Sequence, residues 1–138
     1  MVLTAFGVGS TLQSVGNDVL DTASLAMRHW RSGAADGDWS RLLGMMDPDV
    51  TFHVPVAGFM HQQRGADAAT RFFDHLTAVL RAELEVTSTL HNGDRVGFEV
   101  AVRGTMRGRE FRQALFLVFL VDLAVSGLSS VGSLKLSV

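Results

Sequence analysis

The stretch Asp47–Val56, DPDVTFHVPV, decides how the rest of the chain is interpreted. Pro48 ends any preceding helix, because the residue before a proline is pushed out of the helical region. The residues after it alternate between apolar and other side chains, which predicts a strand over Val50–Val56. Its faces would be Val50, Phe52, Val54 and Val56 on one side and Thr51, His53 and Pro55 on the other. Pro55 cannot donate to a ladder, so the strand ends there or lies at a sheet edge.

The residues before this stretch predict a tail and two helices. Met1–Gly16 is rich in Gly, Ser and Thr without a clear period, so we expect a flexible tail ahead of a single domain over 17–138. Asn17 or Asp18 can cap a helix that ends near Gly33. A second, short helix is expected after Asp38. The two apolar stripes are Val19, Leu20, Ala23, Met27 and Trp30, then Trp39, Leu42, Leu43 and Met46.

The residues after this stretch predict one helix and then an antiparallel meander. The helix spans about Ala66–Arg81 and carries paired phenylalanines on its apolar face. Three strands are predicted over Glu83–Leu90, Arg95–Met106 and Glu110–Val121, with a weak final strand near the C-terminus. The strands are joined at Asn92-Gly93 and Arg107-Gly108, where glycine suits a tight turn. Helices segregated from such a sheet make an α+β fold.

The composition of the 138 residues narrows the function classes. Twelve basic and fourteen acidic residues give a formal net charge of -2, so we expect no nucleic-acid partner. The chain has no cysteine, and its five histidines lack metal-ligand spacing, so no metal site is expected. No signal peptide is recognised, and the longest apolar run, Ala114–Val121, is far shorter than the roughly 20 residues that span a bilayer. We therefore expect a cytoplasmic protein with no membrane partner.

Two segments give the chain a family resemblance. They are AADGDWSRLLGMMDPDVTFHVPV and RGADAATRFFDHL. Their order of helix ends, a "PDV-F" strand and paired phenylalanines resembles that of the nuclear transport factor 2-like superfamily. Within it, the chain is most similar to the SnoaL-like and ketosteroid-isomerase-like branch, over roughly Asn17–Val121. The resemblance implies a cone-shaped, cystatin-like fold, with three helices packed on a strongly curved, mainly antiparallel sheet around a blind apolar cavity. It also implies a homodimer formed through the outer sheet face.

The resemblance is less informative about activity, because several of the branch's functional residues are replaced. The aspartate base of ketosteroid isomerases matches Val54, and their tyrosine falls at Trp30. Neither residue is an efficient acid or base, so steroid isomerisation by that mechanism is not expected. The two aspartates and arginine of limonene-epoxide-hydrolase-like enzymes are not recognisable either. A dehydratase of the scytalone type would need two cavity histidines, which His53 and His75 could supply.

Three functions stay open on these grounds. The first is binding of a small hydrophobic molecule of aromatic, terpenoid or polyketide-like type, without a cofactor, in an apolar pocket. The pocket residues would be Trp30, Met46, Val54, Phe73, Phe98 and Phe116.

The second is a cofactor-independent lyase, isomerase or cyclase that uses His53 as its acid or base, with Trp30 as hydrogen-bond donor. The alternation of the strand favours a different role for His53, because it points this residue away from the face of Phe52 and Val54, toward a dimer interface or a structural hydrogen bond.

The third is a non-catalytic binding or dimerisation module whose cavity is filled by its own side chains. The homodimer would form through the outward sheet face of Glu99 and Arg103, where a cross-strand ion pair is expected, with Arg112 as a candidate partner.

Overall fold

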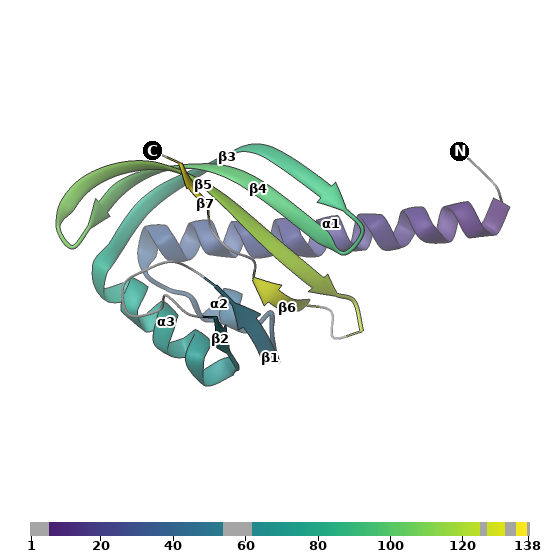
Figure 1. The fold of residues 1–138 in the computed structure, drawn as a ribbon, viewed down its shortest axis with the longest axis horizontal. Helices are drawn as coiled ribbons and strands as arrows, with labels where there is room; N and C mark the ends of the chain where they lie inside the picture. The colour runs from purple at the N-terminus through teal and green to yellow at the C-terminus, as the bar shows by residue number, and fades with distance from the viewer. Residues whose placement is uncertain (1–5, 54–61, 125–126, 132–134, 138) are drawn as a thin grey trace.

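The computed structural model describes residues 6–53, 62–124, 127–131 and 135–137 (Figure 1). Its helices are α1 (Phe6–Asp36), α2 (Ser40–Leu43) and α3 (Ala66–Val79). Its strands are β1 (Met46–Phe52), β2 (Gln63–Arg64), β3 (Leu80–Asn92), β4 (Arg95–Met106), β5 (Arg109–Asp122), β6 (Gly127–Val131) and β7 (Lys135–Ser137). No helix in the described part of the chain is long and apolar enough to cross a membrane.

The strands form one sheet in the order β2-β1-β6-β5-β4-β3, with β7 paired to β5 beside this path. Strands β1 and β6 are parallel, and the other neighbours are antiparallel. The long strands β3, β4 and β5 arch over α1, and α3 lies on the other side of α1, beside β1 and β2 (Figure 1). The predicted α+β fold, with three helices on a curved, mainly antiparallel sheet, is therefore confirmed.

The two predicted hairpins are present. Arg107 and Gly108 have φ angles of 53° and 78°, the positive pair that a two-residue turn with the twist of a hairpin requires. Met106 then pairs with Arg109, and this register continues along β4 and β5. Gly93 has a φ of 63° in the turn between β3 and β4. Both glycines thus lie where a side chain would be strained.

Alternation along the strands separates an inner from an outer sheet face. On β4, the inner face carries Val96, Phe98, Val100 and Val102, all of them buried. The outer face carries Glu99, Ala101 and Arg103, all of them exposed, as predicted. On β5, the buried residues are Leu117, Phe119 and Val121. The core therefore lies between the inner face of the sheet and the helices.

The first helix begins well before the predicted start. The structure places Phe6–Gly16 in α1, whereas the sequence predicted a tail there and a helix from Asn17 or Asp18. Glycines at positions 7, 9 and 16 lower helix propensity, which is why no helix was expected. The sequence nevertheless continues the helical period, because apolar residues recur every three or four positions at Val8, Leu12, Val15 and Val19.

The organising strand also starts earlier than predicted. β1 begins at Met46 and includes Pro48, whereas the sequence predicted a helix to Met46 and a strand from Val50. The pairing of β1 with β6 shifts register between Met46 and Thr51, and this irregularity accommodates a residue that cannot donate. The predicted end of the strand, Val54–Val56, lies outside the described residues.

The strand β6 was not predicted, because its glycine and serines have low strand propensity. It joins β1 to β5 and buries Leu128, whose N–H donates to the carbonyl of Met45 over 2.9 Å. A side chain at Gly127 would meet the same carbonyl, so only glycine permits this approach. The predicted weak final strand is present as β7, paired with Ala114–Phe116 of β5.

Candidate functional site

Seven aromatic rings meet inside the curve of the sheet, and we call this group the aromatic cluster. Its members are Phe52, Trp30, Trp39, Phe72, Phe73, Phe98 and Phe119, and all seven are buried. The ring of Trp39 lies 4.8 Å from that of Phe73 and 5.8 Å from that of Trp30. Phe119 connects Trp30, at 6.1 Å, with Phe98, at 5.8 Å. Phe72 connects Phe73, at 5.0 Å, with Phe52, at 5.4 Å.

The local structure around each tryptophan explains its position. Trp30 belongs to the buried stripe of α1, whose other members are Val19, Ala23, Ala26, Met27 and Ala34. Trp39 immediately precedes α2, and its ring packs against Gly33, where a side chain would overlap it. Asp38 holds this turn by accepting the N–H of Ser40 over 3.0 Å and its hydroxyl over 2.7 Å. These two bonds lower the pKa of the Asp38 carboxyl.

The indole N–H of Trp39 is the exceptional polar group of the cluster. Trp39 is 4% exposed, and its Nε1 atom is buried without a hydrogen-bond acceptor among the described residues. A buried donor that lacks an acceptor costs about 1–3 kcal/mol. The site therefore offers an oriented donor in otherwise apolar surroundings.

The structure brings together only some of the residues predicted to line a pocket. Trp30, Phe73 and Phe98 lie within the aromatic cluster, and Met46 is half-buried against the core. Phe116 lies on the outer sheet face, where its ring covers Gly97. Val54 lies outside the described residues. Trp39 and Phe119 were not in the predicted set, although each is close to Trp30.

The two histidines considered as acids or bases lie near the cluster. His53 is half-buried and directly follows Phe52 at the end of β1. Its neighbours Val50 and Phe52 are buried while Thr51 is half-buried, so the alternation predicted for this strand is confirmed over its described part. His75 is half-buried on α3, between Phe72 and Leu76 in sequence. No charged side chain that the structure describes is buried.

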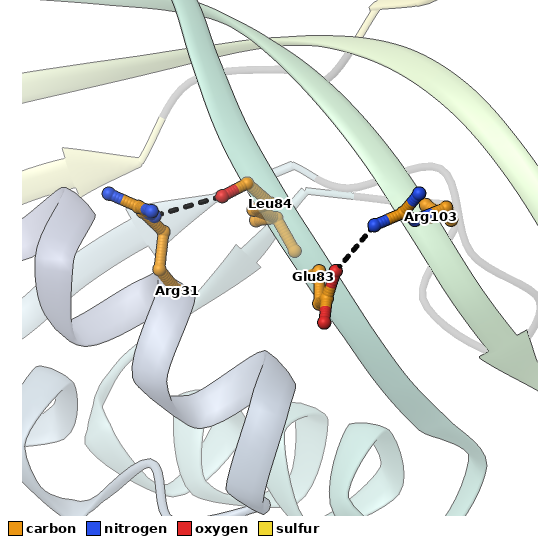
Figure 2. A network of polar contacts seen from close by, with 4 residues as sticks. All are labelled: Arg31, Glu83, Leu84 and Arg103. Atoms are coloured by element: carbon orange, nitrogen blue, oxygen red, sulfur yellow. Dashed lines mark hydrogen bonds and ion pairs between the residues drawn. The ribbon is translucent and has the colours of Figure 1, made fainter.

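The outer sheet face carries a cross-strand ion pair of Arg103, as predicted, but its acid is Glu83 of β3, and neither Glu99 nor Arg112 takes part. Arg103 Nη2 lies 2.8 Å from Glu83 Oε2, and this contact raises the pKa of Arg103 (Figure 2). Arg31 of α1 donates from Nε to the carbonyl of Leu84 over 2.9 Å (Figure 2). Within the described ranges, no three His, Asp or Glu residues come together as metal ligands do.

Comparison with known families decides which group the chain belongs to. The family model of the SnoaL-like domain matches residues 27–124, more than half of the chain. The chain is a member of the SnoaL-like domain family. The matched region contains the aromatic cluster from Trp30 to Phe119 and the whole β3–β5 meander. No curated protein is similar enough in sequence to count as a relative of this SnoaL-like chain.

Solved structures share the fold of this SnoaL-like domain at low sequence identity. An NTF2-like protein from Anabaena variabilis ATCC 29413 matches with a TM-score of 0.79 and 20% identity, over 100% of this chain and 96% of that one. A candidate isomerase from Bacillus subtilis matches with a TM-score of 0.72 and 14% identity, over 85% and 88%. A candidate SnoaL-like polyketide cyclase from Jannaschia sp. CCS1 matches with a TM-score of 0.70 and 17% identity, over 89% and 88%. These likenesses confirm the nuclear transport factor 2-like fold.

Proposed function

We propose that this SnoaL-like domain binds a small hydrophobic molecule of aromatic, terpenoid or polyketide-like type at the aromatic cluster. The observation that carries the proposal is the buried Nε1 atom of Trp39, which has no acceptor among the described residues. A ligand that brings a carbonyl or ether oxygen to this atom would remove the cost of the unpaired donor. One structural neighbour is named as a candidate polyketide cyclase, and that name supports a ligand of this class.

The surroundings of Trp39 favour a ligand with a flat apolar body. Small-molecule sites are built mainly from apolar and aromatic side chains, with few polar groups that set orientation. Phe73 and Trp30 present their rings to Trp39 at 4.8 and 5.8 Å, with the Trp30 ring tilted by 82°. Offset and edge-to-face arrangements of this kind also suit an added aromatic ring.

The test compares two ligands of nearly equal shape, acetophenone and ethylbenzene, which differ by a carbonyl in place of a methylene. Their affinities are measured by calorimetry for the wild type and for Trp39→Phe. Phenylalanine keeps an aromatic ring but has no N–H, so we expect acetophenone affinity to fall by roughly 2- to 10-fold, the range of one net hydrogen bond. Ethylbenzene affinity controls for the smaller ring, and Trp30→Phe controls for the loss of an indole elsewhere in the cluster.

The result that would contradict the proposal is equally specific. If neither ligand binds, the cluster is a filled core that does not take up such molecules, as expected of a binding or dimerisation module whose cavity is filled by its own side chains. If Trp39→Phe weakens acetophenone and ethylbenzene by the same factor, the N–H is not the group that recognises the ligand.

A catalytic role is a second candidate, because half-buried His53 directly follows Phe52, whose ring lies 5.4 Å from Phe72. In this case the domain would be a cofactor-independent lyase, isomerase or cyclase with His53 as acid or base. Saturation with acetophenone should then shift the ring resonances of His53 in NMR spectra, while exposed His91 serves as the control. Equal responses of the two rings would exclude His53 from the ligand site.

A further inference from the structure

An open groove of about 1200 Å³ lies between α1 and the sheet, outside the aromatic cluster. Its charged residues are Arg28 and Arg31 from α1, Glu83 and Glu85 from β3, Arg103 from β4 and Arg112 from β5. Figure 2 shows part of it, where Arg31 and Arg103 approach β3 from opposite sides. The groove includes Ala101 and Arg103 of the outer sheet face, for which the sequence predicted a homodimer contact but no small-molecule site.

The groove is locally positive in a chain that is negative as a whole. Its four arginines exceed its two glutamates by two charges, whereas the formal net charge of the chain is -2. Glu83 is engaged by Arg103, and Arg31 uses only its Nε hydrogen on Leu84. Arg28 and Arg112 are exposed and make no ion pair with any described residue. Guanidinium groups that keep unused N–H donors are well suited to a carboxylate.

Small apolar side chains also line the groove. They are Ala101 and Ala114, which are exposed on neighbouring strands and paired in register, and Ala35 of α1. A groove that presents arginines together with small apolar side chains fits an anion that has a hydrocarbon body better than it fits a bare inorganic ion, because the body would cover the alanines.

We infer that this groove binds a small organic carboxylate with an apolar body, independently of the ligand at the aromatic cluster. The carboxylate is held by guanidinium groups of the groove, and the body lies on the alanines. Because the arginines are exposed, each contributes modestly, and binding weakens as salt screens the charges.

The test follows the backbone amide resonances of the full chain during titration with 4-phenylbutyrate and with its uncharged amide. We expect saturable shifts at Ala101, Ala114 and their neighbours, with the acid bound more tightly than the amide. The double variant Arg28→Gln/Arg112→Gln should weaken the acid by roughly 3- to 10-fold. An ionic strength of about 1 M, with a screening length of ~3 Å, should have a similar effect.

Matched controls make the result decisive. Arg64→Gln/Arg71→Gln removes two exposed arginines outside the groove, so it should leave the affinity within about twofold. Glu83→Gln/Glu85→Gln should tighten binding, because it removes the groove's negative charge. Equal losses in the two arginine variants, equal affinity for acid and amide, or shifts confined to other surfaces would overturn the inference. Acetophenone should not shift the groove amides, so failure here is distinguishable from failure of the proposed function.

Discussion

The contact between Gly33 and Trp39 shows how one residue positions the candidate site. A Cβ atom at Gly33 would fall on the six-membered ring of Trp39, so the absence of a side chain lets the indole pack against α1. Glycine inside a helix ordinarily costs about 1 kcal/mol relative to alanine. Glycine is present at position 33 despite this lower helix propensity, which is consistent with its contact with the Trp39 ring.

Gly33→Ala is therefore expected to destabilise the protein, although alanine is the better helix former. Overpacking typically costs about 1–3 kcal/mol, which outweighs the gain of about 1 kcal/mol in helix propensity. Urea denaturation followed by circular dichroism measures the free energy of unfolding of both proteins. A more stable variant would show that Trp39 does not depend on this contact.

Which aromatic residues reach the cluster was only partly predictable from the sequence. Helical spacing identified Trp30 and Phe73, and strand alternation identified Phe98. Phe116 was assigned to the same pocket, but it pairs with Glu99 rather than with a buried residue. The signal was present, since the two-residue turn at Arg107-Gly108 fixes which residues of β4 and β5 face each other. Pairing the residues outward from that turn places Phe119 opposite Val96, on the buried face, and Phe116 on the other face.

At the scale of elements, α2 has only four residues and depends on the turn that precedes it. Asp38 accepts hydrogen bonds from the N–H and hydroxyl of Ser40, the first residue of α2, although Trp39 occupies the N-cap position. Because Trp39 lies between Asp38 and α2, the same turn helps to hold the indole in place.

The bonds to Asp38 predict a pH dependence. The folded protein lowers the pKa of this carboxyl from its ordinary value of 3.8, so the charged form stabilises the fold. This stabilisation is complete above the unfolded pKa and is lost as the pH falls through the folded pKa. Asp38→Asn keeps an acceptor oxygen without the charge, so its Tm should lie below that of the wild type at pH 7. The two Tm values should converge as the pH falls through the folded pKa of Asp38, below its ordinary value of 3.8; a constant difference would contradict this account.

The elements that the sequence predicted well have local signals, and those it missed do not. Strands β3, β4 and β5 have strong alternation and glycine turns, so their limits were predicted to within a few residues. Strand β6 consists largely of small residues, and its place between β1 and β5 depends on contacts distant in sequence. The early start of α1 was missed because its glycines outweighed a helical period that is visible in the same residues.

At the scale of the whole molecule, the outer sheet face has an apolar part on β5. Phe116, Val118 and Leu120 are half-buried there, on the face opposite the core. The predicted homodimer would cover this part of the sheet. Interface cores are enriched in aromatic and aliphatic residues and depleted in charge, which this strip matches.

Light scattering at micromolar concentration tests the homodimer. We expect the mass of a dimer for the wild type and of a monomer for Val118→Glu, because the variant places an unpaired charge in the interface at a cost of several kcal/mol. Glu110→Gln is the matched control, because Glu110 is exposed at the start of β5, near the turn, and this variant should remain dimeric. A monomeric wild type would contradict the prediction.

The central claim is that the indole N–H of Trp39 recognises the ligand of this SnoaL-like domain. The most direct measurement is a ¹H–¹⁵N spectrum of the two tryptophan side chains, since the chain contains only Trp30 and Trp39. Saturation with acetophenone should move the Trp39 Nε1–H resonance downfield, as a new hydrogen bond does, and ethylbenzene should not. If acetophenone binds while this resonance shifts no more than it does with ethylbenzene, the claim is wrong.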